Sequence, residues 1–435
     1  MKKEINQEFL DKVRKQYAKD KNAHVLNAAV AKTPLIDLAF VRQAAAKLDG
    51  EFEVEVKTHG VTAQQQSGRC WMFSVMNIMR EIVIKNCNLE GFELSGNYLA
   101  FYDKLEKCNN CLELYIENAK KPLEDRMMEY TLDGIGDGGY FSMAVDLVNK
   151  YGIVPKYVMP ETEQSTHTAK LMFLLNNLLR RDGAVLRKLV AEKKDPYPEK
   201  EKMMAEIYKA LCIAFGEPVT EFDFSYRDKD KNFHQDYKMT PKSFYEKYIG
   251  MKLNDYITIT NEPTENKKLN KAYSFHYMGN MAESNVDYIN LPIEQLKDLA
   301  IKQLKDGEPV WFACDAGAYG DRKMGVWDQD SVDFESLLGG VDMYLEKGER
   351  LMYNASFGTH AMILTGVNFD KKGKPNRYKI ENSWGDEVGK KGYFVCSDKY
   401  FDEYVYEVII NKKHLNAEQK KILKMKPTVL MPWIK

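Results

Sequence analysis

Strand-forming residues are concentrated in the last third of this chain, and helix-forming patterns fill much of the rest. Runs rich in β-branched and aromatic residues predict strands at 309–314, 361–367, 377–380, 392–396 and 404–410. Before them, residues 70–84 carry a dense apolar set that is typical of a buried helix. A helical half followed by a β-rich half predicts an α+β fold of two lobes with a cleft between them.

Further helices are predicted on both sides of this division, at about 6–17, 34–46, 97–114, 140–151 and 293–305. A loop is expected between the first two, and a short alternating strand at 52–57. A glycine-rich loop at 133–139 precedes the fourth helix. Residues 226–270 are polar and contain Pro241 and Pro263, so loops and short elements of an exposed insertion are expected there.

Composition and charge argue against several classes of protein. The chain has 435 residues, 44% of them hydrophobic, and a net charge of −1 at pH 7. This balance gives no general attraction for nucleic acid or for an anionic membrane, and the mixed charges over 180–202 are expected to form a solvated helix face. No run approaches the ~18 apolar residues of a membrane span. The first residues are charged and lack an apolar signal core, so a cytoplasmic protein is expected.

The chain contains seven cysteines, whose odd number and irregular spacing favour reduced thiols over a disulfide framework. Cys108 and Cys111 form a CxxC pair, a pattern that can hold a metal or carry redox chemistry. The sequence has neither a second CxxC nor a paired histidine motif, and the pair lies inside a predicted helix with no strand before it. We therefore expect a structural role for both cysteines, and neither a metal nor a cofactor for the protein.

Cys70 is the sharpest candidate for a chemical role. It opens the helix predicted at 70–84, where the partial positive charge of a helix N-terminus favours a thiolate. The alternative is a small buried core residue, which is the usual fate of a free cysteine. Gln64, six residues earlier, can donate its side-chain amide to a developing oxyanion together with the Cys70 backbone N–H. With Trp71 directly after the thiol, this context favours a nucleophile.

His360, Asn382 and Trp384 complete the candidate constellation. His360 precedes a predicted strand and would exchange protons with the thiol and the leaving group. Asn382, within Glu-Asn-Ser-Trp-Gly, would accept the N–H of His360 and fix the orientation of the imidazole ring. Trp384 would shield that hydrogen bond from water. A lone histidine is more often structural, but its pairing with Asn382 makes this interpretation specific.

Gly138 and Gly139 form a further candidate element. Because they have no side chains, an extended peptide can approach and pair with their backbone. An ordinary turn before the next helix would explain two glycines equally well, so both interpretations stay open.

These motifs resemble the papain clan, and the finer pattern resembles the bleomycin hydrolase and aminopeptidase C family. Gly68-Arg69-Cys70-Trp71 stands in place of papain's Gly-Ser-Cys-Trp, and Ser67 stands where secreted papains carry a disulfide cysteine. Further matches extend over nearly the whole chain, at 94–95, 98, 103–106, 137–139, 150–155, 226–232, 307–312, 359–361, 381–386 and 402–405.

The resemblance implies a papain-like fold with a helical lobe, a β-barrel-like lobe and helical insertions. It divides the chain into an N-terminal helical arm (1–60), a helical lobe with the nucleophile helix (61–165), an insertion or assembly region (166–300), a β-rich lobe with His360 and Asn382 (301–415) and a C-terminal arm that enters or borders the cleft (416–435). It also implies a cysteine peptidase that acts on peptides and forms a homohexamer whose active sites face an inner cavity.

The C-terminal arm departs from the family pattern. Aminopeptidases of the family place the terminal carboxylate of a full arm in the cleft, where it binds the amino terminus of the substrate. Here the sequence stops at Lys435, a few residues short of that pattern. We therefore expect endopeptidase or mixed action on oligopeptides, as in the lactobacillal branch of the family. A strict aminopeptidase is the alternative, and a thiol acyltransferase or a nucleic-acid-binding protein is more remote.

Overall fold

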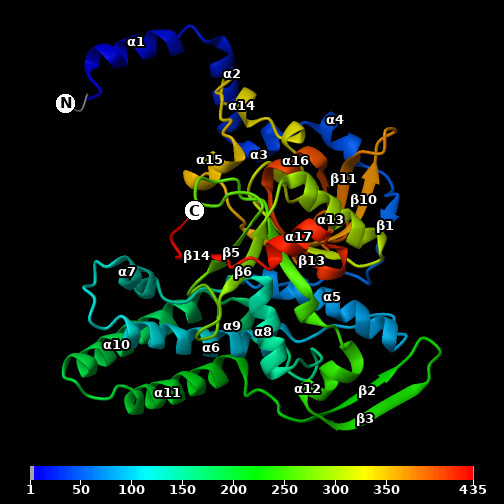
Figure 1. The fold of residues 1–435 in the computed structure, drawn as a ribbon. Helices are drawn as coiled ribbons and strands as arrows, with labels where there is room; N and C mark the ends of the chain where they lie inside the picture. The colour runs from blue at the N-terminus through cyan, green and yellow to red at the C-terminus, as the bar shows by residue number, and fades with distance from the viewer. Residues whose placement is uncertain (1–3, 435) are drawn as a thin grey trace.

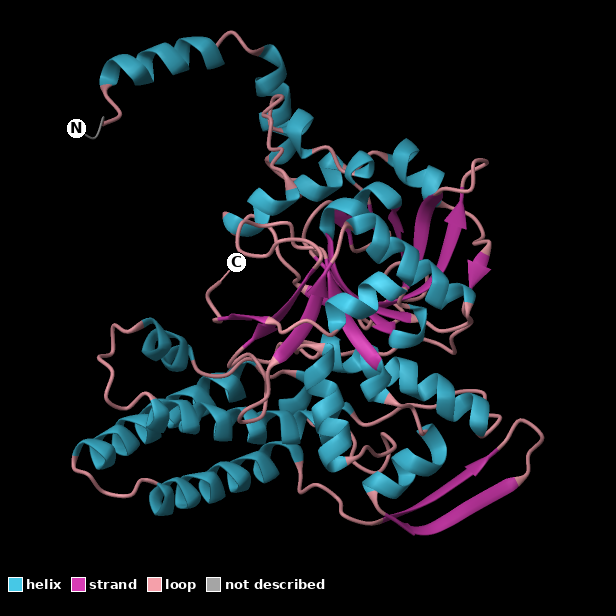
Figure 2. Ribbon diagram, in the orientation of Figure 1, coloured by secondary structure: helices cyan, strands magenta, loops and turns pink. Residues whose placement is uncertain are grey.

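The computed structural model describes residues 4–434 and places a helical lobe against a lobe built on a large sheet (Figure 1). Most helices of residues 70–215 gather on one side of the molecule, and the strands of the main sheet gather on the other (Figure 2). The α+β organisation in two lobes that was expected from the sequence is confirmed.

Helices dominate the first half of the described chain, and further helices lie among the strands of the second half. Their bounds are α1 Gln7–Tyr17, α2 Lys21–Val30, α3 Leu35–Ala39, α4 Arg42–Ala45, α5 Cys70–Asn86, α6 Gly96–Glu117, α7 Arg126–Asp133, α8 Phe141–Tyr151, α9 Glu163–Thr166, α10 Ala169–Ala191, α11 Tyr197–Phe215, α12 Pro241–Phe244, α13 Ile293–Lys305, α14 Phe334–Leu337, α15 Lys347–Met352, α16 Asp398–Tyr404 and α17 Ala417–Leu423. Turns of 3-10 or π-helix are η1 Ala46–Leu48, η2 Tyr245–Ile249, η3 Leu253–Asp255, η4 Gln329–Ser331 and η5 Lys412–His414.

A 12-stranded sheet forms the second lobe, in the order β14-β5-β6-β4-β13-β7-β10-β11-β12-β9-β8, with β1 paired to β10. A separate hairpin, β2–β3, projects from the helical lobe (Figure 1). The strand bounds are β1 Val54–Glu55, β2 Phe222–Arg227, β3 Phe233–Met239, β4 Tyr256–Thr260, β5 Lys271–Phe275, β6 Val286–Asn290, β7 Val310–Cys314, β8 Gly320–Asp321, β9 Val326–Trp327, β10 His360–Phe369, β11 Pro375–Glu381, β12 Tyr393–Ser397, β13 Val405–Asn411 and β14 Thr428–Leu430.

Helix α5 joins the two lobes. Its apolar residues are buried on almost every side, as the dense apolar pattern predicted. They share one core cluster with the sheet residues Trp311, Ile363 and Ile409. The indole N–H of Trp311 also donates to the backbone oxygen of Trp71 at 3.1 Å. The first turn of α5 is therefore fixed against the centre of the sheet, between β7 and β10.

The prediction for residues 226–270 is wrong in part. The β2–β3 hairpin and the turns after it fit the expected short elements, but β4 lies in the middle of the main sheet, between β6 and β13. Its residues Thr258 and Thr260 are buried although they are polar, because both neighbouring strands cover them. β5 and β6 were also missed, so the sheet takes strands from a stretch whose sequence is dominated by polar residues.

The N-terminal prediction also needs correction. Helix α2 occupies the stretch where a loop was expected, and the helix expected at about 34–46 is broken. The break comes at Phe40 and Val41. Phe40 adopts extended backbone and bridges to Val332, and the Val41 N–H donates to the Ser331 oxygen at 2.9 Å. Tertiary pairing thus interrupts a pattern that is locally helical.

The charged stretch 180–202 lies on two helices, because α10 ends at Ala191 and α11 begins at Tyr197, next to Pro196. The other expected helices and strands are present with small shifts at their ends. Over residues 4–434, no helix is long and apolar enough to cross a membrane.

Candidate active site

A cavity of about 640 Å³ lies where the start of α5 meets the sheet. The sequence candidates Gln64, Cys70, Trp71, Gly138, Gly139 and His360 all line it. Asn382 and Trp384 lie directly behind His360, as shown below. Lys435, at the end of the C-terminal arm, lies outside the described residues. The structure therefore brings the remaining candidates together from both ends of the chain.

Cys70 is the first residue of α5 and is reached from the cavity. The residue before it is Arg69, whose side chain does not cap the helix. No capping side chain therefore accepts from the first backbone N–H groups of α5. Burial raises the pKa of the Cys70 thiol, while the backbone N–H groups of Ala361, Trp71 and Cys70 itself lower it. These donors are oriented to stabilise negative charge at this position.

His360 is oriented by Asn382. Its Nε2 lies 2.8 Å from the Asn382 Oδ1, the distance of an N–H···O hydrogen bond. The backbone N–H of Ser383 donates to the same Oδ1 at 2.7 Å, which identifies this atom as the acceptor oxygen of the amide. Both side chains are buried, so the imidazole ring has little freedom to turn.

Trp384 covers the histidine as the sequence suggested. The two rings stack with their centroids 4.6 Å apart and their planes at 24°. The guanidinium of Arg322 lies over the indole of Trp384, 4.6 Å from its centroid. Burial lowers the pKa of His360 to about 4, the bond to Asn382 opposes this shift, and Arg322 adds to it.

Burial therefore favours the neutral forms of both Cys70 and His360. A thiolate at Cys70 gains stability when its proton moves to His360, because the two charges then attract each other in a poorly solvated site. The N–H groups at the start of α5 add to that stabilisation. The arrangement suits a thiol that ionises by giving its proton to the neighbouring imidazole.

Gln64 is fixed to the segment that carries Asn382. Its backbone N–H donates to the Ser383 oxygen at 2.8 Å, and its side-chain Oε1 accepts from the Ser383 hydroxyl at 2.7 Å. Its Nε2 donates to the Ser67 oxygen at 2.5 Å. An amide nitrogen carries two hydrogens, so a second donor remains for a group in the cavity. The side chain is positioned by both lobes at once.

Gly138 and Gly139 differ in the space that surrounds them. A Cβ built on Gly139 would lie 2.6 Å from the Cε2 of Trp71, so the close packing of that indole excludes a side chain. A Cβ on Gly138 would meet nothing within 4 Å, and its backbone lies at the open cavity. Both residues line the cavity, so pairing of their backbone with a substrate stays a prediction for both, and the packing of Trp71 is a further reason for glycine at 139.

Sequence reasoning missed the charged residues that hold this loop. Lys107 Nζ donates to the oxygens of Gly136 at 3.1 Å and Gly138 at 2.7 Å. Its neighbour Lys104 forms ion pairs with Asp103 at 2.9 Å and Asp137 at 2.8 Å. Lys104 and Lys107, one turn apart on α6 beside Asp103, were the available signal.

Asp137 connects the glycine loop to the segment before Cys70. It accepts from the Gly68 N–H at 3.1 Å and from the Thr168 hydroxyl, and its backbone oxygen accepts from the Trp71 indole at 2.9 Å. Burial alone would raise the pKa of Asp137, but Lys104 and these donors hold it well below its usual value. The loop and the thiol segment are thus fixed together by a buried charge.

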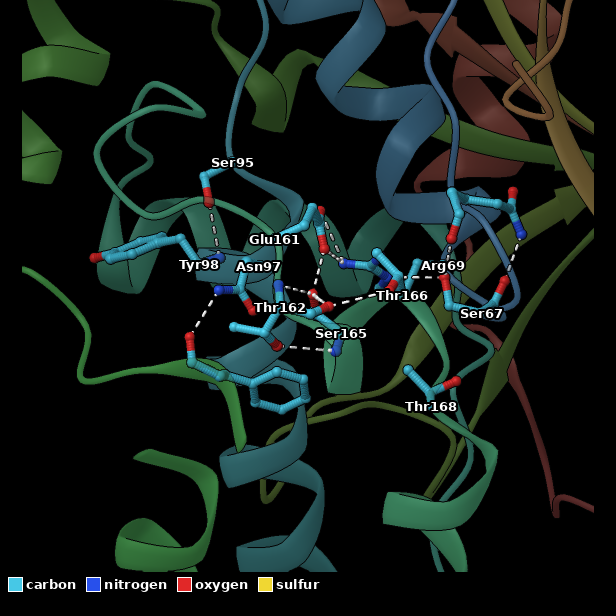
Figure 3. Close-up of polar contacts among 12 residues, drawn as sticks. Ser67, Arg69, Ser95, Asn97, Tyr98, Glu161, Thr162, Ser165, Thr166 and Thr168 are labelled. Carbon is cyan, nitrogen blue, oxygen red and sulfur yellow. Dashed lines mark hydrogen bonds and ion pairs between the residues drawn. The ribbon is translucent and has the colours of Figure 1, made fainter. Parts of the chain in front are cut away.

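A second missed network surrounds Arg69, the residue before Cys70 (Figure 3). Arg69 is fully buried, and its Nε donates to the Ser67 hydroxyl at 2.9 Å. Its guanidinium pairs with Glu161 at 3.0 Å, and Glu161 also accepts from Ser165 at 2.5 Å. Asn97 and Thr162 extend the network towards α11, where Thr162 donates to the Ala214 oxygen at 2.8 Å. The residue before the thiol is therefore anchored through several helices.

Within residues 4–434, no group of three or more His, Cys, Asp or Glu side chains is placed to hold a metal ion. Cys108 and Cys111 are free thiols buried in α6, and burial raises the pKa of Cys111 to about 12. All seven cysteines are free. The CxxC pair is part of the helical core, as expected.

Comparison with known proteins agrees with this geometry. The model of the Peptidase C1-like family matches residues 4–434. Aminopeptidase C from Listeria monocytogenes serovar 1/2a is 41% identical over 100% of this chain and 98% of its own length. Aminopeptidase G from Lactobacillus delbrueckii subsp. lactis is 41% identical over 95% of each chain.

The crystal structure of PepW from Lactobacillus rhamnosis HN001 superposes with a TM-score of 0.96, at 43% identity, over 100% of this chain and 98% of PepW. The papain-like fold and the family expected from the motifs are both confirmed. The chain belongs to the Peptidase C1-like family and is a cysteine peptidase.

Proposed function

We propose that the protein hydrolyses peptide bonds of oligopeptides through an acyl-enzyme on Cys70. In the first step the Cys70 thiol gives its proton to His360, and the sulfur attacks the peptide carbonyl carbon. The oxyanion accepts from the Gln64 amide and the Cys70 backbone N–H. His360 then protonates the departing amine, the C–N bond breaks, and a thioester remains. Water, deprotonated by His360, attacks the thioester and releases the acid and the thiol.

One observation carries this proposal: His360 is held by Asn382 at 2.8 Å on the wall of the cavity that also contains the Cys70 thiol. An orienting amide, an imidazole and a helix-terminal thiol are the parts that a cysteine peptidase requires. The open backbone at Gly138 supports binding of an extended peptide along this cavity. Trp384 supports catalysis by excluding water from the bond between His360 and Asn382.

The names of the relatives support removal of amino-terminal residues, and we propose aminopeptidase action for this chain. The endopeptidase or mixed action expected from the C-terminal arm stays a prediction. We also propose that residues 416–435 border the cleft, because Leu430 and Ile434 of this arm share a cluster with Tyr140, which lines the cavity.

The test is hydrolysis of one unblocked peptide by wild type and by Cys70→Ala. Loss of the nucleophile should lower the rate on the order of 10⁴-fold. Equal rates would show that Cys70 is not the nucleophile. Mass spectrometry of the products from free and N-acetylated versions of that peptide separates the modes: acetylation abolishes aminopeptidase cleavage but spares internal cleavage. Addition of a competing amine tests the acyltransferase alternative.

Assembly and location also stay predictions. We propose a homohexamer because α1 extends away from the rest of the molecule (Figure 1) and exposes Phe9 and Tyr17, with no buried residue of its own. Light scattering after size-exclusion chromatography gives the mass directly.

The free cysteines support a reducing compartment such as the cytoplasm. The five-part division of the chain and the absence of a nucleic-acid partner remain proposals of the same kind.

A further inference from the structure

The cavity is lined by two carboxylates that the catalytic proposal does not use, Glu262 and Glu407, and Glu407 is the one without a partner. Glu407 lies on β13 and lines the same cavity as Cys70 and His360. Its side chain is only 7% exposed. Its Oε1 is buried without a hydrogen-bond partner. A buried acceptor without a hydrogen-bond partner raises the free energy of the folded protein. A ligand in the cavity that donates to Oε1 would remove this cost.

The sheet register places Glu407 relative to the thiol. Ala361 on β10 pairs with Ala313 on β7, and Ala313 pairs with Glu407 on β13. Neighbouring strands lie about 4.8 Å apart, so Glu407 lies roughly 10 Å across the sheet from Ala361. The Ala361 N–H lies beside the Cys70 sulfur. Only the small side chains of two alanines separate the thiol from the carboxylate along this row, and both alanines line the cavity.

The charges around Glu407 do not neutralise it. Glu262 lines the cavity as well, but it is paired with Lys267 at 2.7 Å. Lys347, a buried lysine near Glu262, donates instead to the backbone oxygens of Asp402 at 2.8 Å and Val405 at 2.7 Å. No ion pair within residues 4–434 involves Glu407. Burial raises the pKa of Glu407 to about 8, and the charge of Glu262 adds to this shift.

We propose that Glu407 forms a subsite for a positively charged group of the substrate, an ammonium or guanidinium, on the amino side of the bond that is cut. This inference deepens the proposed peptidase function and rests on it. A bound cation would supply both the missing hydrogen bond and the missing charge, and it would favour the ionised carboxylate.

Two sources of that charge fit the distance. An extended peptide advances about 3.3–3.6 Å per residue, so a Lys or Arg side chain one residue before the acylating residue can reach roughly 10 Å from the thiol. A free α-amino group at that residue, or one further along, is the second source. The amino side is part of the proposal, and Gly138, which we propose pairs with the substrate backbone, lines the same cavity as Glu407.

Three fluorogenic substrates separate these sources, each with leucine joined to a coumarin amide. They are acetyl-Lys-Leu-, acetyl-norleucine-Leu- and norleucine-Leu-coumarinamide. The leaving group is uncharged, so a positive charge can lie only on the amino side. Wild type should show kcat/KM at least about 10-fold higher for a positively charged substrate than for acetyl-norleucine-Leu-coumarinamide. An advantage for the first substrate identifies the side chain as the source, and an advantage for the third identifies the α-amino group.

The variant Glu407→Gln keeps the shape of the side chain and removes its charge. The ratio of kcat/KM between charged and uncharged substrates should collapse to within about 3-fold in this variant. Glu201→Gln, an exposed carboxylate on α11 outside the cavity, is the matched control and should keep the wild-type ratio. No advantage for either cation in wild type, or an unchanged ratio in Glu407→Gln, would overturn the proposal.

A binding measurement keeps the subsite testable if hydrolysis fails. Fluorescence anisotropy gives the Kd of dye-labelled peptides containing Lys or norleucine for Cys70→Ala and for Cys70→Ala with Glu407→Gln. Tighter binding of the Lys peptide that is lost with Glu407→Gln supports the subsite even if wild type proves not to be a peptidase. Equal affinities of the Lys and norleucine peptides in both proteins, together with unchanged affinity of Glu407→Gln for a norleucine peptide with a free amino terminus, overturn it, whatever the catalytic result.

Discussion

At the scale of single residues, the bond between His360 and Asn382 decides whether the imidazole can serve the thiol. Replacing Asn382 by Ala removes the acceptor at 2.8 Å and leaves a buried ring N–H without a partner. Loss of a hydrogen bond to a group that becomes charged costs about 1.5–3 kcal/mol, which corresponds to roughly a 10- to 100-fold fall in kcat/KM. Steady-state kinetics on one peptide measures this fall in kcat/KM, and thermal unfolding shows whether the variant is folded. Full activity in a folded Asn382→Ala would contradict the assigned role.

Glu407 gives a second prediction at this scale, on stability and pH. Its pKa in the folded protein is about 8, against an ordinary 4.5, so the folded state keeps a proton that the unfolded state has released. The contribution of Glu407 to the free energy of unfolding is therefore fully present below about pH 4.5 and is lost as pH rises through about 8. Glu407→Gln removes that loss and should raise the free energy of unfolding at pH 9 by on the order of 2–4 kcal/mol, with little change at pH 4. Urea unfolding at the two pH values checks it, and an equal effect at both would show that Glu407 is not a buried titrating group.

The residues of the site differ in how far sequence could predict them. Cys70, Gln64 and Asn382 stand in local motifs, and His360 could be paired with Asn382 because a predicted strand follows it. Glu407 could not be predicted, because a glutamate in a strand normally faces solvent. Its burial depends on pairing with β4 and β7, and β4 itself was missed.

At the scale of elements, the glycine loop before α8 offers a matched pair of substitutions. A methyl group at Gly139 would lie 2.6 Å from the Trp71 ring, so Gly139→Ala must displace the indole at the start of α5. Such overpacking costs about 1–3 kcal/mol. Gly138→Ala meets open space and should leave the unfolding midpoint nearly unchanged while raising KM. Chemical unfolding and peptide kinetics on both variants test this, and equal destabilisation would refute the different roles of the two glycines.

Elements with strong internal patterns were predictable, and those that depend on distant partners were not. The apolar density of α5 and the β-branched runs of β7, β10 and β13 fix their type locally. β5 and β6 lie among polar residues, and β14 is short and exposed in part, so only their pairing in the sheet makes them strands. The helix expected at 34–46 was broken by a bridge between Phe40 and Val332 for the same reason.

At the scale of the whole molecule, the two lobes are held together by a buried ion pair behind the site. Arg80 on α5 contacts Glu381, the residue before Asn382, at 2.6 Å, and also donates to the Gly60 oxygen at 2.7 Å. Burial raises the pKa of Glu381 to about 7, and Arg80 opposes this shift. Arg80→Ala would leave Glu381 buried without its partner and should cost about 3–5 kcal/mol of unfolding free energy at pH 8.

The double variant Arg80→Met with Glu381→Leu controls for loss of the charge itself. Replacing both members of a buried pair by apolar residues should recover much of the stability lost in Arg80→Ala. Denaturant unfolding followed by fluorescence measures all three proteins. A single variant as stable as wild type would show that the pair does not join the lobes energetically.

The central claim is that Cys70 forms a covalent acyl-enzyme, and one measurement tests it most directly. Wild-type protein is mixed with an activated peptide ester, quenched in acid after a short time, digested and analysed by mass spectrometry. We predict a mass increase equal to the acyl group on the peptide that contains Cys70, absent from Cys70→Ala and slower to appear in Asn382→Ala. Hydrolysis of the ester without any adduct on Cys70, or an equal rate of hydrolysis by Cys70→Ala, would contradict the account.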